Sequence, residues 1–130
     1  MKNKQNILIA EDDAFLAKII GNHLKNDGYN VHVVENGEEA IQRIAKNDYS
    51  LILLDLIMPV KDGFEVMKDM QKMEKETPPV LVFSNLSQEE DKEEAERLGA
   101  TDFYVKANIS VEDLTKIVKK YIREENLVKK

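Results

Sequence analysis

Short apolar runs alternate with longer amphipathic segments along this chain. Each run is bounded by turn-forming or charged residues, a pattern typical of short strands buried in a sheet. The runs cover residues 7–10, 31–34, 51–54, 80–83 and 103–105. This pattern predicts five strands.

Apolar residues recur at helical spacing in the segments that follow the runs. Turn residues, prolines and cap-like polar clusters mark the ends of these segments. The predicted helices run from Phe15 to near Gly28, after Asn36 through Ala45, from Phe64 through Met73 to Pro78, from the capping-box pattern of residues 87–90 to near Gly99, and from Ser110 through Ile122. Five helices therefore alternate with the five strands.

This alternation predicts a doubly wound α/β fold. Strand–helix–strand units have right-handed crossovers and give a parallel sheet that is covered on both faces. Such sheets bind ligands at the carboxyl ends of their strands, where the strand order reverses. Four predicted strands end in polar groups: Glu11 and Asp12 after the first, Asp55 after the third, Ser84 after the fourth and Lys106 after the fifth. We expect these side chains to converge on one crevice.

The residue types in this crevice predict phosphoryl chemistry. Three carboxylates that lie close together repel one another, and a hard divalent cation relieves the repulsion by binding their oxygens. Glu11, Asp12 and Asp55 suit Mg²⁺. With the metal and Lys106 neutralising phosphate oxygens, Asp55 is placed to attack a phosphoryl group and hold it as an acyl phosphate, while Ser84 donates a hydrogen bond.

Other polar and apolar residues near these positions have simpler interpretations. We expect Asp13 to cap the first helix, because an acidic side chain at a helix start satisfies free N–H groups and favours the dipole. His23 and His32 lie on a predicted helix and an edge strand, outside the crevice, so neither is a candidate for phosphotransfer. The methionines at 67, 70 and 73 are expected to fill the core.

Composition narrows the possible classes of function. The 130 residues suit one domain, and the net charge of −6 argues against nucleic-acid binding by phosphate neutralisation. Without cysteine, disulfides and thiolate metal sites are excluded. The sequence shows neither a signal-peptide core nor an apolar stretch of membrane-span length. We therefore expect a cytoplasmic location, with no nucleic-acid or membrane partner.

Four motifs occur in order along the chain: ILIAEDD at residues 7–13, DLIMPVKDG at residues 55–63, Ser84 after the fourth strand, and GATDFYVK at residues 99–106. In order and spacing they resemble the receiver domains of bacterial two-component response regulators, of which the chemotaxis regulator is a single-domain member. The resemblance covers nearly the whole chain. It implies a flavodoxin-like sheet in the order 2-1-3-4-5 and one receiver domain over residues 1–130, with no effector domain.

The resemblance also implies a role for each candidate residue. Asp55 would be the phosphoacceptor, Ser84 and Lys106 would match the family's hydroxyl and lysine, and Phe103 would be an aromatic switch whose rotamer follows the hydroxyl. The implied metal ligands are the carboxylates of Glu11, Asp12 and Asp55 and the backbone carbonyl of Ile57.

Two positions depart from the family pattern. The family usually places a proline, in a cis peptide, after the lysine, where this chain has Ala107. A non-proline cis bond costs about 2.5–4 kcal/mol, so either the Lys106–Ala107 peptide bears that strain or the loop takes another path. Asn85 replaces a commonly small residue and is large enough to narrow access to Asp55 or to bond the phosphoryl group. We expect altered phosphorylation kinetics.

The implied function is a phosphorylation-activated signalling switch. A sensor histidine kinase or a histidine phosphotransfer protein would supply the phosphoryl group. The domain would catalyse its own phosphorylation and dephosphorylation without being an enzyme in the usual sense. Output would pass through protein contacts or a phosphorelay to a downstream protein target, from a monomer or a phosphorylation-dependent dimer.

Three other functions fit parts of the pattern. A phosphatase of the haloacid dehalogenase type needs a second aspartate two residues after the first, where this chain has Ile57. A flavodoxin-like cofactor binder needs a Ser-, Thr- or Gly-rich phosphate loop after the first strand, where this chain has acids. A phosphorylation-independent interaction module, or pseudo-receiver, is the third alternative. The intact Asp55, Lys106 and acidic pair argue against it.

Overall fold

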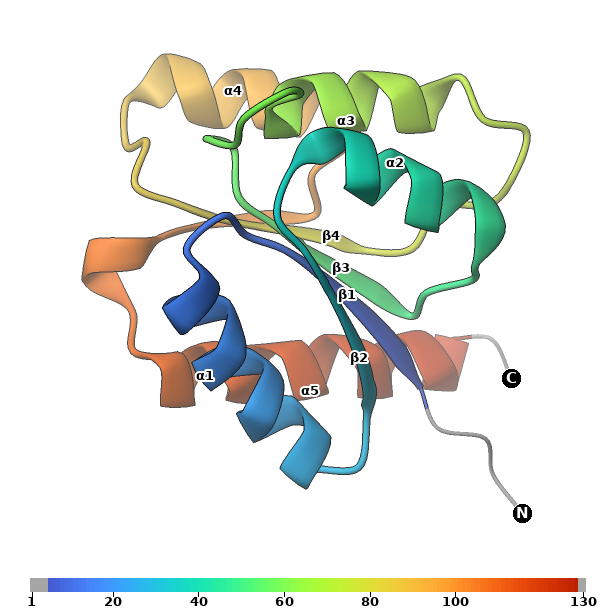
Figure 1. Ribbon diagram of the computed structural model, residues 1–130, viewed down its shortest axis with the longest axis vertical. Helices are drawn as coiled ribbons and strands as arrows, with labels where there is room; N and C mark the ends of the chain where they lie inside the picture. The colour runs from blue at the N-terminus through green and yellow to red at the C-terminus, as the bar shows by residue number, and fades with distance from the viewer. Residues whose placement is uncertain (1–4, 129–130) are drawn as a thin grey trace.

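The chain forms a five-stranded parallel sheet with helices on both faces (Figure 1). Its structure, a computed structural model, describes residues 5–128. The strands are β1 (Asn6–Ala10), β2 (Asn30–Val34), β3 (Leu51–Leu54), β4 (Val80–Ser84) and β5 (Asp102–Val105). They lie in the order β2-β1-β3-β4-β5, so the five predicted strands and the expected order are both confirmed.

Two helices cover one face of the sheet and three cover the other (Figure 1). The first pair is α1 (Ala14–Asn26) and α5 (Val111–Val128); the second group is α2 (Gly37–Lys46), α3 (Gly63–Gln71) and α4 (Glu89–Arg97). This is the doubly wound α/β architecture that the alternating pattern predicts. Within residues 5–128, no helix is long and apolar enough to cross a membrane.

The core consists of two apolar layers, one on each side of the sheet. Successive residues of a strand point to opposite faces, so Leu8 packs beneath α2 to α4 whereas Ile7 and Ile9 pack against α1 and α5. β3 and β4 are buried along their whole length. Each fully buried Leu or Ile side chain contributes about 1.5–3 kcal/mol, which fixes the position at which β3 ends and Asp55 follows.

The loop between β3 and α3 turns back tightly behind Asp55. Asp62 caps α3 in a capping box, accepting a hydrogen bond from the Glu65 amide at 2.8 Å while the Glu65 carboxylate accepts one from the Asp62 amide at 3.2 Å. A Cβ on Gly63 would lie 2.5 Å from the Asp55 carbonyl oxygen. Glycine therefore allows α3 to begin this close to the end of β3.

The amino end of α2 is held against the same loop. The Gly37 amide donates to the Lys61 carbonyl at 3.1 Å, and a Cβ on Gly37 would collide with that carbonyl. The Lys61 ammonium lies 2.5 Å from an Asp69 carboxylate oxygen in α3 and 3.7 Å from Glu38 in α2. The loop is thus tied to both neighbouring helices.

α3 is shorter than the sequence predicts. It ends at Gln71, because the amides of Lys72 and Met73 turn back to carbonyls only three residues earlier, each at 3.1 Å, and close the helix. Met73 therefore lies beyond the helix and is half-buried, whereas Met67 and Met70 are buried in the core as expected.

α4 lacks the capping box predicted over residues 87–90. The helix begins at Glu89, and its first carbonyl acceptor is that of Gln88, which accepts from the Lys92 amide at 3.3 Å. The N-cap position thus falls on Gln88, whose side chain makes no cap hydrogen bond, and Ser87 lies outside the helix. The predicted capping box was therefore wrong, because the N-cap lies one residue later than Ser87.

The loop after β5 takes a path without a cis peptide. No peptide bond in residues 5–128 is cis, and Lys106–Asn108 instead form a short 3₁₀ helix between β5 and α5. The chain therefore avoids the strain of a non-proline cis bond at Ala107.

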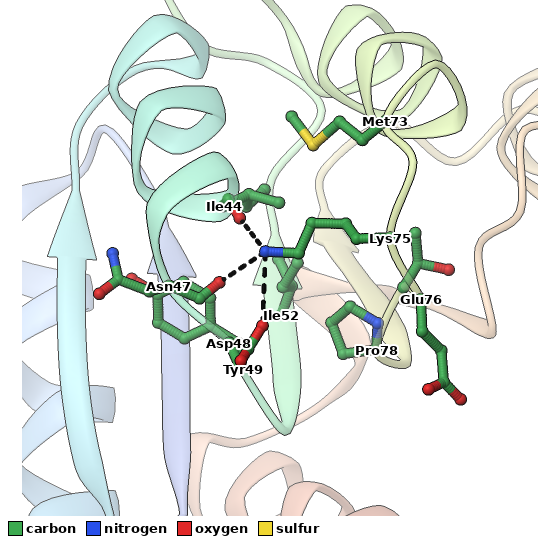
Figure 2. A pocket seen from close by; sticks show the side chains of 10 residues that line it. Ile44, Asn47, Asp48, Tyr49, Ile52, Met73, Lys75, Glu76 and Pro78 are labelled. Atoms are coloured by element: carbon green, nitrogen blue, oxygen red, sulfur yellow. Dashed lines mark hydrogen bonds and ion pairs between the residues drawn. The ribbon is translucent and has the colours of Figure 1, made fainter.

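A cavity of about 330 Å³ lies at the opposite edge of the sheet, before β3 and β4 (Figure 2). The Lys75 ammonium extends across it and donates to the carbonyls of Ile44 at 2.8 Å and Asn47 at 3.1 Å, with an Asp48 carboxylate oxygen 3.5 Å away. A cation at the carboxyl end of a helix satisfies free carbonyls and favours the dipole. Lys75 therefore holds the end of α2 against the α3–β4 connection.

Candidate functional site

Asp55 is buried at the end of β3. Its amide donates to the Ala10 carbonyl at 3.0 Å, which continues the pairing of β3 with β1 by one residue and fixes the backbone. The residue is 4% exposed; Oδ1 accepts from the Ile57 amide at 3.2 Å, and Oδ2 accepts from Lys106 Nζ at 3.0 Å. A carboxylate this buried has its charge compensated by a cation, as the sequence pattern requires.

Glu11 is the second buried carboxylate of the site. It is 2% exposed; Oε1 lies 2.6 Å from Lys106 Nζ, and Oε2 accepts from the Asp13 amide at 3.1 Å. Burial raises the pKa of Glu11 from its ordinary 4.5 to about 7, and the charge of Asp55 acts in the same direction. The hydrogen bonds from Lys106 and the Asp13 amide oppose this shift without cancelling it.

Lys106 lies between these two carboxylates. Burial alone would lower the pKa of Lys106, but its hydrogen bonds to Glu11 and Asp55, and their charges, raise the pKa above its ordinary value. The ammonium also lies 5.7 Å from the centroid of the Phe83 ring, within the range of a cation–π contact. The sequence pattern marks Phe83 only as a buried strand residue and does not predict this contact.

Glu11, Asp12 and Asp55 form a group that could hold a metal ion. Each offers a carboxylate oxygen, and these oxygens lie within 4.8 Å of one another. Carboxylate oxygens at this spacing fit a hard divalent cation, and the exposed Asp12 leaves one side open to solvent. The neighbouring Asp13 caps α1 as predicted, since its side chain accepts from the Leu16 amide at 3.1 Å.

Ser84 lies at the same edge of the sheet. It is fully buried at the end of β4, where it pairs in register with Val105, the residue before Lys106. Its Oγ accepts from the Leu86 amide at 3.4 Å. Asn85 follows it and is exposed. The β4–β5 pairing therefore brings the Ser84 hydroxyl to the same edge of the sheet as Lys106. A hydrogen bond from this hydroxyl to a phosphoryl group stays a prediction.

Phe103 lies on β5, half-buried against the core layer beneath α2 to α4. A polar network that the sequence did not predict surrounds its backbone. Asp102 Oδ1 accepts from the Phe103 amide, and Oδ2 accepts from the hydroxyls of Tyr104 and Tyr121, each at 2.9 Å. Although burial opposes it, these bonds hold the pKa of Asp102 below its ordinary value. The network links β5 to α5, and burial together with the bond to Asp102 raises the pKa of Tyr104.

Val60 adopts a backbone conformation that side chains rarely take. Its φ is 69°, and the Lys61 amide donates to the Pro59 carbonyl at 2.8 Å, which together give a γ-turn with positive φ at its centre. A β-branched residue in this region is strained by about 1–3 kcal/mol. The strain lies in the loop that follows Asp55.

Neither histidine contributes to the site. His23 is exposed on α1, and His32 Nδ1 on β2 lies 2.7 Å from the Tyr49 hydroxyl, with the two rings edge to face. The positions predicted for both histidines, outside the crevice, are therefore confirmed.

Comparison with known proteins agrees with the fold. The response regulator receiver domain family model matches residues 7–119. YkoG of Bacillus subtilis, named as an uncharacterised transcriptional regulatory protein, is 33% identical over 121 residues, covering 93% of this chain and 52% of that protein.

Solved receiver domains have the same fold as this chain. The receiver domain of the Francisella response regulator 1452 has a TM-score of 0.84 and 30% identity, covering 93% of this chain and 98% of that one. The response regulator TrrA of Thermotoga maritima, solved in complex with Mg²⁺-BeF, has a TM-score of 0.77 and 26% identity, covering 90% of this chain and 98% of that one.

The chain is a doubly wound α/β domain whose candidate site lies at the carboxyl ends of β1, β3, β4 and β5. This chain belongs to the response regulator receiver domain family of two-component systems. It spans about half the length of the curated relatives it matches, such as YkoG and ResD of Bacillus subtilis.

Proposed function

We propose that this domain is a phosphorylation-activated signalling switch in which Asp55 accepts a phosphoryl group from phosphohistidine. The donor would be a sensor histidine kinase or a histidine phosphotransfer protein. The observation that carries this proposal is the Lys106 ammonium, held 2.6 Å from Glu11 and 3.0 Å from Asp55. A buried cation beside a strand-end carboxylate is placed to neutralise the charge that an incoming phosphoryl oxygen brings.

Mg²⁺ is the metal that we assign to the acidic group. Its proposed ligands are the carboxylates of Glu11, Asp12 and Asp55, whose oxygens lie within 4.8 Å of one another, and the backbone carbonyl of Ile57. When bound, the ion neutralises charge on the transferring phosphoryl group. TrrA, a relative of the same fold, was solved in complex with Mg²⁺-BeF, which supports this assignment.

Phosphoryl transfer then needs one bond to form and one to break. A carboxylate oxygen of Asp55 attacks phosphorus in line while the bond from phosphorus to the histidine nitrogen breaks. With its other ring nitrogen protonated, the histidine leaves as neutral imidazole, and Asp55 becomes an acyl phosphate. Lys106 then pairs with one phosphoryl oxygen, and the Ser84 hydroxyl donates to another.

The acyl phosphate is expected to hydrolyse slowly in the isolated domain. Ile57, which is 53% exposed, and the half-buried Leu86 flank the site with apolar side chains, where a polar group would orient an attacking water. Replacing Ile57 by Asn should shorten the phosphoryl lifetime, measured by decay of the labelled protein. A wild-type lifetime of only seconds would contradict the expectation.

The switch itself would couple the phosphoryl group to the surface around β5. Ser84 moves toward the phosphoryl oxygens, and Phe103, now half-buried, turns inward into the space that Ser84 leaves. This motion biases a two-state equilibrium of α4, β5 and α5, whose surface contacts a downstream protein. The chain spans about half the length of its curated relatives. What the switch controls in a whole protein is therefore also a proposal.

A labelling experiment tests the assignment directly. The chain is incubated with phosphoramidate and Mg²⁺, and acyl phosphate is measured by intact mass. Asp55→Asn should abolish labelling, and chelation of the metal should do the same. Asp13→Asn is the matched control, because Asp13 caps α1 outside the metal group, and it should label normally. Undiminished labelling of Asp55→Asn would refute the phosphoacceptor, and no labelling of wild type under these conditions would favour the pseudo-receiver.

A further inference from the structure

β2 is the outer strand of the sheet, and its far side has no neighbouring strand within residues 5–128 (Figure 1). At one end of its ladder the Asn30 amide donates to β1 at 2.9 Å, and at the other the Val34 carbonyl accepts from the residue after β1 at 3.0 Å. Alternate residues of a strand direct their backbone groups to opposite sides, so Val31 and Val33 face outward. Two N–H and two C=O groups are therefore open to a partner.

β2 lacks the features that usually protect an edge strand from pairing. Such edges carry charged side chains, proline or a bulge. β2 has the sequence NVHVV and pairs with β1 residue for residue, so it has no Asp, Glu, Lys, Arg, proline or bulge. The opposite edge strand, β5, carries Asp102. Beyond β2, the Glu35 amide is capped by the Glu39 carboxylate at 3.1 Å, so the open stretch ends with Val33.

Basic side chains flank this open edge on both faces of the sheet. On the α1 side, Lys18 and Lys25 line a pocket of about 200 Å³. On the α2 side, Arg43 and Lys46 line a pocket of about 430 Å³. Val33 lines both pockets, so both lie along the open edge. The four basic residues are exposed, and none forms an ion pair with another described residue.

The acids near this edge do not neutralise its positive charge. Glu11 lines the α1-side pocket, but it is 2% exposed and its Oε1 lies 2.6 Å from Lys106 Nζ. The exposed acids are Glu35 and Glu39, and Glu39 already accepts from the Glu35 amide. Four exposed cations thus face two exposed carboxylates. The β2 edge is therefore locally positive in a chain whose net charge is −6.

The open backbone and the flanking charge together distinguish between possible partners. Nucleic acid would meet the cations but has no extended row of alternating donors and acceptors to pair with the strand. A second copy that paired β2 with β2 would bring the lysines and arginines of the two copies together, and like charges repel across an interface. An extended peptide segment with Asp or Glu side chains matches both the backbone groups and the charge.

We propose that the β2 edge binds an extended acidic segment of another protein by strand addition. The backbone of the segment pairs with the outward N–H and C=O groups of Val31 and Val33. Its side chains alternate between the two faces of the sheet, so carboxylates reach the lysines of α1 on one face and Arg43 and Lys46 on the other. This binding needs neither a metal ion nor a phosphoryl group on Asp55, and it is independent of the proposed function.

A fluorescein-labelled Glu/Val peptide, with glutamates on both faces of its extended form, tests the charge at this edge. Anisotropy titrations with the full chain should show binding, and a Lys/Val peptide should not bind. The Lys18→Glu, Lys46→Glu double variant should bind the Glu/Val peptide at least about tenfold more weakly, because close charge pairs govern such contacts. Lys68→Glu, Lys72→Glu makes the same charge change at exposed sites elsewhere and should have little effect. Equal weakening by the two double variants would overturn the proposal.

N-methylated peptides test the backbone pairing without any change to the protein. A strand uses one alternating set of its amides at each edge, so N-methylation of one set should abolish binding and N-methylation of the other should not. Equal affinity of the two methylated peptides would refute strand addition. Amide chemical-shift changes over residues 30–35 on peptide addition support the site, and changes confined to another face refute it. A dimer of the chain alone whose interface maps to β2 would make a second copy the occupant and overturn the proposal.

Discussion

Lys106 compensates two buried carboxylates at once, and this is the central electrostatic fact of the site. Glu11 and Asp55 are nearly inaccessible to solvent, and each is within 3.0 Å of the same ammonium. Burial, together with the charge of Asp55, raises the pKa of Glu11 to about 7, and the single ammonium does not cancel this shift. The metal-free site therefore changes its protonation close to neutral pH.

This raised pKa predicts a pH dependence of stability. An acid with a raised pKa binds its proton more tightly in the folded chain than in the unfolded chain. The contribution of Glu11 to stability is therefore present in full below pH 4.5 and is lost as pH rises to about 7. Urea unfolding in chelator should show wild type losing stability relative to Glu11→Gln across this window. A constant difference between the two proteins would contradict the prediction.

The strained Val60 predicts a stabilising substitution. Val60→Gly relieves strain of about 1–3 kcal/mol at a cost of about 0.5–1 kcal/mol in unfolded-chain entropy, so the free energy of unfolding should rise by about 1 kcal/mol. The control is Val33→Gly, at an exposed position of β2 with ordinary φ, which should lose about 1 kcal/mol. Urea midpoints measure both. Loss of stability in both variants would mean that Val60 is not strained.

Single residues were predictable where they stand at strand ends. Asp55 and Lys106 follow apolar runs directly, and parallel strands bring their carboxyl ends to one edge, so the sequence pattern alone predicts that they meet. No sequence pattern predicts the positive φ of Val60, because it arises from the tight return of the loop to α3. The Asp102–Tyr121 bond joins residues nineteen apart, and only the docking of α5 brings them together.

At the scale of elements, strands were easier to predict than helix ends. All five strands lie where the apolar runs lie, since burial on both faces leaves little choice of residue type. The last residue of α3 and the first residue of α4 depend instead on which backbone hydrogen bonds form within one turn. At α3 the Lys72 amide donates to a carbonyl only three residues earlier, and at α4 the Gln88 carbonyl is the first acceptor. Such competition shifts a helix end by one or two residues without changing the sequence pattern.

The tether at the end of α2 predicts a measurable cost for its removal. Lys75→Met deletes two charged hydrogen bonds to the carbonyls of Ile44 and Asn47 and should destabilise the domain by about 1–2 kcal/mol. Hydrogen exchange should also quicken at the last turn of α2. Lys72→Met is the matched control, because the exposed Lys72 forms no side-chain bond with the described residues. Equal effects of the two changes would show that the tether contributes nothing.

For the whole molecule, metal binding should stabilise the folded state. An ion that binds only the folded chain adds about 1.4 kcal/mol when its free concentration is about ten times its dissociation constant. Mg²⁺ should therefore raise the melting temperature of wild type, and Asp12→Asn should lose most of this gain. Asp13→Asn should keep the gain, since asparagine also caps helices well. An undiminished Mg²⁺ response in Asp12→Asn would place the metal elsewhere.

α2 has both of its ends attached to different edges of the sheet. At one end the Gly37 amide donates to the Lys61 carbonyl in the β3–α3 loop, and at the other end Lys75 donates to the Ile44 carbonyl at the distant cavity. A helix of that length is a stiff rod of about 15 Å. If the loop shifts and α2 moves with it as one body, we expect the far end of the helix to shift as well. If the two ends of α2 are coupled in this way, a small molecule bound in the cavity should, by reciprocity, shift the β3–α3 loop.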